Sequence, residues 1–339
     1  NGNTTQQTTP VKIDKSSNFN NSEVVAFWTA GDSYPHCFAL TAEGKFYAWG
    51  RNADGQLGIG NTTDQSSPVE VTATNAVAFT DDGVGRIKKL LVESRSDDGR
   101  SAILTERGTI YWCGQGNYGW HGDGNTTIIN TWTLSTNGPG NSSNADCVNM
   151  WFTGAAHYPN MWVEDSLGNI SVAGYNGYGQ MGTGNTTDST TFVTPKVQIG
   201  SNTQRNLKNV KYFASYDHHN DTSVKCLTWD GHVFTTGRNN YGMGAIGHNS
   251  GNVSDRDAEN GKEHFNDYCF QPIKQPNSMV GNVEEIVGAG YGDNSDACYG
   301  FFMYKTFHNR FYMNGYGGSY LQGTSDGQHW NTPHTPILG

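Results

Sequence analysis

Short apolar runs, separated by clusters of glycine, asparagine and aspartate, recur along the whole chain. The runs are rich in valine, phenylalanine, tyrosine and tryptophan, a composition typical of β-strands. Pairs such as Glu43-Gly44 and Asp230-Gly231 lie between successive runs and favour tight hairpins, because glycine accepts the positive φ of these turns. No helical period extends beyond about two turns. The pattern predicts an all-β protein, and in the first stretch it predicts strands at 24–29, 36–41, 45–50 and 68–71.

A glycine- and asparagine-rich phrase follows the second run of each stretch and returns about every sixty residues. The three clearest occurrences span Gly44–Thr63, Gly108–Thr127 and Gly168–Thr187, and weaker ones begin at Gly231 and Asn309. A fixed period of this size indicates an array of one supersecondary unit. Four strands per unit, repeated radially, predict a β-propeller of four-stranded antiparallel blades, a plan that protects sheet edges by closing a ring.

The first phrase reads G-x-x-Y-x-W-G-x-N-x-x-G-Q-L-G-x-G over Gly44–Gly60, and a Ser-Pro-Val closes the unit at Ser67–Val69. In these residues the chain resembles the regulator of chromosome condensation repeats. The resemblance implies a propeller, which this family usually closes with seven blades, and at least five are visible here. The second and fourth occurrences keep the glycines but lose Gln-Leu, and the fifth also lacks the first glycine.

The expected domain organisation is a single repeat array over residues 1–339. Gly2–Ile13 aligns without gaps on Gly60–Val71, so we expect residues 1–13 to be the closing strand of a preceding repeat. We favour further repeats upstream of Asn1, and the alternative is that this strand pairs in the last blade or on another chain. The five predicted repeats cover 14–71, 72–135, 136–199, 200–275 and 276–339.

The alternation of side chains between the two faces of a strand also predicts how the aromatic residues of the run 45–50 pack. We expect Tyr47 and Trp49 to lie on opposite faces of the strand 45–50, and Trp49 or its neighbour Phe46 to pack between blades.

Composition narrows the classes of partner. The net charge is −10, only 15% of residues are charged, and 12% are aromatic. The acidic balance argues against a nucleic-acid surface, which needs a concentrated basic patch. No apolar run approaches the roughly eighteen residues of a membrane span. The abundance of asparagine, threonine and glycine favours an extracellular or virion surface protein, whose partners would be other proteins of an assembly or a host-surface glycan. Cytoplasmic localisation is the alternative.

Aromatic residues near the phrase supply the first candidate contacts. Tyr118, Tyr178 and Tyr241 share one phase of the repeat, where we favour packing against the next blade over a binding ring. Residues that break the repeat are better candidates for exposed partner contacts, and these are Trp120, His121, Tyr316 and Tyr320.

The fourth unit is longer than the others, and the excess falls within an insertion at 248–269. Long insertions in regular arrays are often functional. Acidic residues alternate there as in a calcium loop, but we favour a solvated loop or partner contact. The candidate contacts in the insertion are Asp255, Asp257, Glu259 and His264. The loop 217–221 carries His and Asp side chains, but a plain polar loop is favoured over a metal site.

No metal, cofactor or catalytic residue is assigned, because neither a C-x-x-C pair nor a nucleophile or paired-carboxylate motif stands out. The favoured function is a non-enzymatic binding or structural module of an extracellular or virion assembly, such as a phage tail or fibre, or of a secreted surface protein. One alternative, implied by the resemblance, is an intracellular scaffold or a nucleotide-exchange factor for a small GTPase. The other alternative is a polysaccharide-active enzyme.

Overall fold

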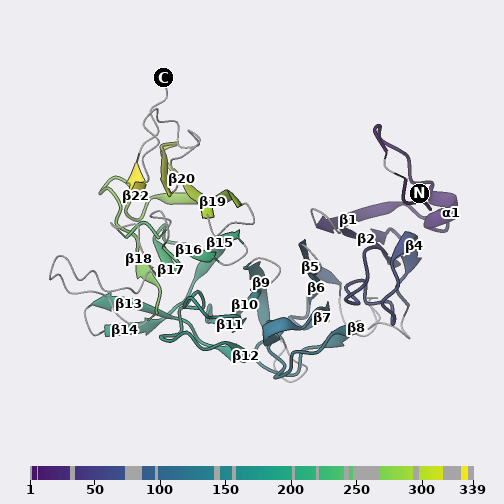
Figure 1. The fold of residues 1–339 in the computed structure, drawn as a ribbon, viewed down its shortest axis with the longest axis horizontal. Coiled ribbons are helices and arrows are strands. Elements are labelled where there is room, and N and C mark those ends of the chain that lie inside the picture. The colour runs from purple at the N-terminus through teal and green to yellow at the C-terminus, as the bar shows by residue number, and fades with distance from the viewer. Residues whose placement is uncertain are drawn as a thin grey trace.

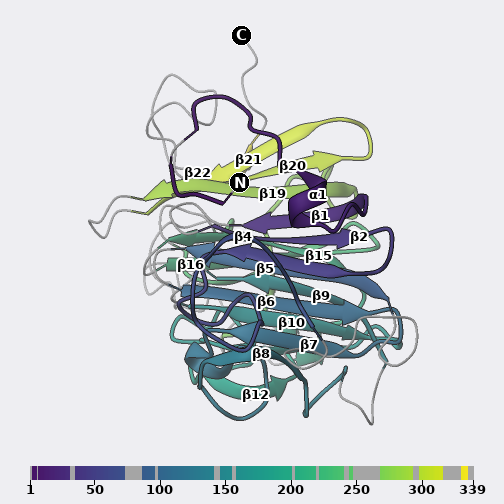
Figure 2. The same cartoon turned by 90° about the vertical axis from the view of Figure 1, so that its right-hand side faces the viewer.

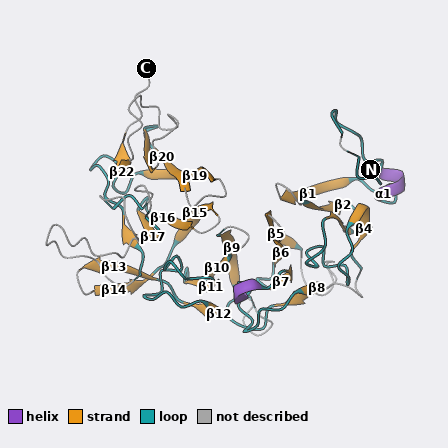
Figure 3. Cartoon of the chain, viewed as in Figure 1, coloured by secondary structure: helices purple, strands orange, loops and turns teal. Residues whose placement is uncertain are grey.

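The structure is a computed structural model, in which the secondary structure is almost entirely β (Figure 3). The helical segments within the described part are one turn, α1 (Lys15–Asn18), and one 3-10 turn, η1 (Asn117–Gly119). The residues that the structure describes are 2–5, 7–30, 35–72, 86–95, 98–140, 146–154, 158–200, 203–218, 221–239, 244–246, 268–292, 298–315 and 330–334.

Five four-stranded antiparallel sheets follow one another along the chain, and in each the strands hydrogen bond in sequence order. The first contains β1 (Val24–Ala30), β2 (His36–Thr41), β3 (Phe46–Gly50) and β4 (Gln65–Glu70). The second contains β5 (Ile87–Arg95), β6 (Asp98–Thr105), β7 (Ile110–Gly114) and β8 (Ile129–Leu134). The third contains β9 (Cys147–Thr153), β10 (Asn160–Asp165), β11 (Ile170–Gly174) and β12 (Ser189–Val193).

A two-stranded hairpin, β13 (Lys196–Gly200) and β14 (Thr203–Asn206), precedes the fourth sheet. That sheet contains β15 (Val210–His218), β16 (Asp221–Thr228), β17 (Val233–Gly237) and the short β18 (Gln271–Pro272). The fifth contains β19 (Val283–Gly292), β20 (Cys298–Thr306), β21 (Phe311–Gly315) and β22 (Trp330–His334).

The sheets are arranged around an open arc, from β1–β4 near the N-terminus to β19–β22 near the C-terminus (Figure 1). The strands run across the arc, along its short dimension (Figure 2). Radially repeated four-stranded sheets are the architecture of a β-propeller, so the predicted fold class is confirmed, with at least five blades.

The strand order gives the arc two faces. Connections between first and second strands, and between third and fourth strands, leave from one end of each sheet, which we call the connection face; 115–128 and 175–188 are examples. Turns between second and third strands lie at the other end, which we call the turn face; 166–169 and 229–232 are examples.

An asparagine of the repeated phrase holds the connection that follows the third strand in the first and third sheets. The Asn52 amide donates to the carbonyls of Asn61 (2.9 Å) and Thr63 (3.1 Å), while its oxygen accepts from the Leu57 N–H (3.0 Å). Asn176 makes the equivalent bonds in the third sheet. These bonds satisfy backbone groups that have no ladder partner in the loop, which explains why the phrase contains asparagine at this position.

Glycines of the phrase let each unit pack tightly against the next. Gly55 has φ +75, and a Cβ there would lie 2.5 Å from the Asn130 Cα of the second sheet. Gly119 has φ +65, and its Cβ would lie 2.7 Å from the Thr190 Cα of the third. The repeat therefore encodes contacts between sheets as well as turns within them.

Aromatic side chains fill the spaces between neighbouring sheets. Phe38 and Phe46 stack at 5.2 Å between ring centroids, and Trp132 of the next sheet lies 5.7 Å from Phe38. Between the third and fourth sheets Trp162 stacks on Phe213 at 4.2 Å. Such contacts add to the free energy gained by burying the rings.

The expectation for strand β3 is half right. Phe46 packs between sheets, as predicted, but Tyr47 and Trp49 lie on the same face, since residues two apart in a strand share a face. Both rings contact Phe19, with centroid distances of 5.2 and 6.2 Å. The segment around α1 thus covers the side of the first sheet that points away from the second.

The predicted repeat boundaries and the pairing of residues 1–13 stay predictions. In the described part of 1–13 no strand is assigned, and the Gly2 N–H donates to the Ser66 carbonyl of β4 (3.1 Å). Residues 248–267 of the predicted insertion lie outside the described residues.

Candidate functional site

Four tyrosines from the second and third sheets meet on the connection face, and we call Tyr118, Tyr158, Tyr175 and Tyr178 the tyrosine cluster. Tyr118 lies in η1, after β7, Tyr158 lies between β9 and β10, and the other two follow β11. The Tyr175 ring is central: its centroid lies 4.2 Å from that of Tyr158, 4.9 Å from that of Tyr118 and 6.0 Å from that of Tyr178. All four side chains are half-buried, so the cluster is both packed and accessible.

Local backbone features position the central rings. A Cβ at Gly177 would lie 2.1 Å from the Tyr175 hydroxyl oxygen, so the Tyr175 side chain lies directly against this glycine. Tyr118 has φ +60, a conformation uncommon for a residue with a side chain. The connection between β7 and β8 therefore holds the Tyr118 ring toward the third sheet, where it contacts Tyr158 and Tyr175.

Charged groups surround the cluster. The Arg238 guanidinium, just after β17, lies 5.0 Å from the centroid of the Tyr178 ring, which is cation–π geometry. Burial raises the pKa of Tyr175 and Tyr118, and the neighbouring tyrosines and Asp188 add to the effect, so these hydroxyls are neutral donors at physiological pH. The carboxylate of Asp188 is exposed beside them.

This arrangement suits recognition of a cation. Tyrosine rings present a negative face to cationic side chains, and Arg238 already uses one ring in this way. Rings fixed by mutual packing lose little conformational entropy on binding, which is why tyrosine is frequent at binding hot spots.

Trp120 and His121 do not have the exposure that the sequence predicted. Trp120 is 0% exposed and His121 is 1% exposed. In the repeat Trp120 takes the position of Gln56 and Gln180; its indole N–H donates to the Gln115 carbonyl (2.5 Å). The prediction of exposed contacts here is wrong, because the side chains that break the repeat pack in the core.

The His121 ring belongs to a buried aromatic and hydrogen-bonded group. It stacks on Trp112 with centroids 3.6 Å apart, and its Nδ1 accepts from the Asp123 N–H (3.3 Å). The Asp123 carboxylate accepts from the Trp112 indole N–H (2.7 Å) and from the Thr136 N–H (2.9 Å). Burial lowers the pKa of His121 to about 4, so the ring is neutral at pH 7.

The remaining candidates fall outside the described residues, and a role for them in partner binding stays a prediction. They are Tyr241, Asp255, Asp257, Glu259, His264, Tyr316 and Tyr320.

Sequence reasoning found half of the cluster. Tyr118 and Tyr178 were visible as one phase of the repeat, and packing against the next unit was favoured for them; the Tyr118 ring does contact residues of the third sheet. Tyr158 and Tyr175 were missed. Tyr175 takes the position that Arg51 and Gln115 hold in the preceding units, so no periodic aromatic signal marks it.

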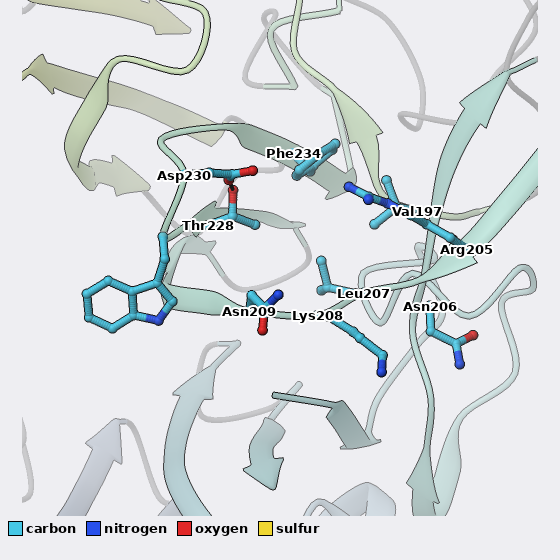
Figure 4. Close-up of a pocket in the computed structure, with 10 residues that line it drawn as sticks. Val197, Arg205, Asn206, Leu207, Lys208, Asn209, Thr228, Asp230 and Phe234 are labelled. Atoms are coloured by element: carbon cyan, nitrogen blue, oxygen red, sulfur yellow. Dashed lines mark hydrogen bonds between the residues drawn. The ribbon is translucent and has the colours of Figure 1, made fainter. Parts of the chain in front are cut away.

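A cavity of about 790 Å³ lies toward the turn face, between the β13–β14 hairpin and the turn that follows β16 (Figure 4). Its residues include Val197, Arg205, Leu207, Trp229 and Phe234. The cavity is remote in the fold from the tyrosine cluster, because the two sites lie at opposite ends of the strands.

Metal sites and membrane-spanning helices are both absent from the described part of the chain. There, no three His, Cys, Asp or Glu side chains are grouped so that they could hold a metal ion. Nor does any helix within the described residues have the length and apolar character needed to cross a membrane.

Comparisons with known proteins agree with the repeat pattern. Residues 43–85 match the regulator of chromosome condensation (RCC1) repeat. The ultraviolet-B receptor UVR8 of Arabidopsis thaliana is 29% identical over 221 residues, which are 65% of this chain and 42% of that protein. The protein RCC2 homolog of Danio rerio is 32% identical over 32% of this chain and 20% of its own length. The chain thus spans less than half the length of these relatives.

Solved structures give the same fold. Human WBSCR16 aligns with a TM-score of 0.55 at 17% identity, over 89% of this chain and 65% of that one. Yeast RCC1 (Prp20), in its complex with Kap60, aligns with a TM-score of 0.54 at 15% identity, over 93% and 64%. The repeat match, the relatives and the shared fold together identify this chain as an RCC1-like β-propeller.

Proposed function

We propose that this chain is a non-enzymatic, protein-binding propeller that uses the tyrosine cluster to hold a basic segment of a partner protein. One observation carries the proposal: four half-buried tyrosine rings, drawn from both neighbouring sheets, are in contact on the connection face beside the carboxylate of Asp188. The chain's net charge of −10 complements a basic partner.

The relatives favour the scaffold reading over an extracellular or virion assembly. They include an ultraviolet-B receptor and RCC2 proteins, and they support an intracellular setting instead. For Prp20p of Saccharomyces cerevisiae, which shares the fold, binding to Gsp1p and histones is described. Histones are basic, so they are suitable probe partners for the proposed site. The comparisons lend no support to a polysaccharide-active enzyme.

Equilibrium titration with purified core histones tests the proposal. We expect Tyr175→Ala/Tyr178→Ala to weaken binding at least about tenfold, which corresponds to roughly 1.4 kcal/mol. Trp229→Ala is the matched control, because it removes an exposed aromatic ring from the turn face. Tyr175→Phe keeps the ring and should keep most of the affinity. Unfolding midpoints of all variants check that they are folded.

If the double variant is folded and binds histones as tightly as the parent, the cluster is a packing feature and the proposal is wrong. Equal affinity of parent and Trp229→Ala, together with weaker binding at raised salt, would support it, since screening weakens contacts between a basic segment and nearby carboxylates.

A nucleotide-exchange function is the second candidate, because Gsp1p is a binding partner of the structural neighbour Prp20p. Release of fluorescent GDP from purified Gsp1p, with and without this chain, tests it. Acceleration by the parent would support exchange activity, and an unchanged rate at saturating chain would exclude it for this protein pair.

A further inference from the structure

The cavity on the turn face has an apolar floor and a cationic wall. Val197, Leu207 and Phe234 are buried side chains of the core between the third and fourth sheets, and they form the floor. Arg205, on β14, is exposed and reaches across Val197 toward Phe234 (Figure 4). Lys208, after β14, is exposed at the same rim. A site of this kind can take an apolar group and an anionic group together.

The carboxylate at the cavity, Asp230, is held by neighbouring side chains of its own turn. Asp230 accepts a hydrogen bond from the Thr228 hydroxyl, and its carboxylate lies 3.3 Å from Nδ1 of His232. These contacts, with the Thr228 bond as the larger cause, hold the pKa of Asp230 below its usual value. Within the described part of the chain, neither Arg205 nor Lys208 has a carboxylate in ion-pair contact. Arg205 and Lys208 outnumber the one carboxylate among the residues of the cavity, so its rim carries a net positive charge on a chain whose net charge is −10.

Trp229 adds a large exposed ring to this rim. Its side chain is 65% exposed, while its backbone N–H donates to the Asn209 carbonyl (3.1 Å), which fixes the turn that carries it. The Lys211 ammonium lies 5.8 Å from the ring centroid. Exposed tryptophan next to cationic side chains is typical of sites that bind protein segments.

We propose that this cavity binds an acidic peptide segment of a partner protein. An apolar side chain of the segment packs on Val197, Leu207 and Phe234, and flanking carboxylates pair with Arg205 and Lys208. The proposal does not rest on the tyrosine cluster, which lies at the other end of the strands and has the opposite charge preference. The chain would then bring together two segments of opposite charge.

A fluorescently labelled peptide, acetyl-Glu-Asp-Phe-Leu-Asp-Glu-amide, is the probe, and its affinity for the whole chain is measured by anisotropy. We expect saturable binding that weakens at least about tenfold in Arg205→Glu/Lys208→Glu. Trp229→Ala should also weaken it. The matched control, Lys12→Glu/Lys15→Glu, reverses two exposed charges on the N-terminal segment and should bind like the parent.

Three further results decide the outcome. A peptide with lysine in place of each acidic residue should bind at least about tenfold more weakly than the acidic peptide. Equal binding of the two peptides, equal binding by the Arg205/Lys208 variant, or no saturation of the parent at about 1 mM peptide would each overturn the proposal. Histone binding by the same variants reports on the tyrosine cluster, so failure of one site is distinguishable from failure of the other.

Discussion

Phe46 and Trp49 are three residues apart on β3, but they are buried to different extents. Phe46 is buried between two sheets, whereas Trp49 is half-buried beneath the α1 segment. We expect Phe46→Ala to lower the free energy of unfolding by about 3–5 kcal/mol, as for other buried phenylalanines. Trp49→Ala should cost less, because its ring keeps solvent contact. Chemical denaturation measures both, and a Trp49→Ala cost equal to or above that of Phe46→Ala would contradict the assignment of faces.

Buried histidines should make the protein sensitive to acid. Burial lowers the pKa of His121 to about 4 and that of His36 to about 3. The unfolded chain binds these protons near pH 6.5, whereas the folded chain resists them. The free energy of unfolding is therefore unaffected by these histidines above that pH, and it decreases as the pH falls toward 4. Each adds a slope of up to about 1.4 kcal/mol per pH unit in this window.

Leu57 and Met181 occupy the repeat position of His121, so His121→Met is the natural test. The effect of Glu164 on stability has the opposite pH dependence, because burial raises its pKa to about 7. Glu164 is present in both parent and variant, so its effect cancels in the difference between their stabilities. We expect the variant to become more stable relative to the parent as the pH falls from 6.5 to 4.5. His308→Gln, at an exposed site, is the control, and a constant difference across this range would disprove the role of His121.

The sequence predicted residues of the repeat well and exceptions to it poorly. Asn52 and Gly55 belong to the phrase, and the amide bonds of Asn52 and the positive φ of Gly55 recur at Asn176 and Gly179 of the third unit. Trp120 looked exposed because it broke the pattern, but replacing Gln by Trp filled the core. Tyr175 was missed because the cluster forms between units, and contacts of this kind have no periodic signal.

At the scale of strands, agreement was close. The expected run 24–29 corresponds to β1 (Val24–Ala30), and 36–41 corresponds to β2. The fourth run, expected at 68–71, is the longer β4 (Gln65–Glu70), because pairing with β3 continues through the serines to Gln65. Serine and glutamine carry little strand preference, so only the ladder reveals this extension.

Strand β16 contains a costly residue in a buried position. Lys225 is 0% exposed, its ammonium lies 4.4 Å from the Phe302 ring centroid, and it donates to the Thr235 hydroxyl (3.2 Å). Burial lowers its pKa well below the usual value, so stability is lost below pH 10.5, where the unfolded lysine takes up its proton.

Lys225→Met should therefore raise the free energy of unfolding at pH 7, because methionine carries no charge that burial would desolvate. The methionine keeps contact with Phe302. Lys12→Met, on the exposed N-terminal segment, controls for loss of charge. A less stable Lys225→Met protein would mean that the lysine makes contacts worth more than its desolvation.

The whole molecule presents two chemically different faces on one arc. The connection face has the tyrosine cluster beside Asp188, and the turn face has the apolar cavity with Arg205 and Lys208 at its rim. Because the cluster lies on connections anchored by strands and the cavity is lined partly by strand residues, the sheets set the geometry of both. This arrangement is what a scaffold requires, since two segments can be held on opposite faces of the same arc.

Site-specific photo-crosslinking to core histones tests the central claim most directly. The crosslinker p-benzoylphenylalanine replaces Tyr178 in one variant and Trp229 in another, and the crosslinked peptides are identified by mass spectrometry. We expect the label at Tyr178 to capture lysine- and arginine-rich histone segments, and the label at Trp229 to capture few or none. Capture of those segments mainly from Trp229, in a folded protein that binds histones, would contradict it.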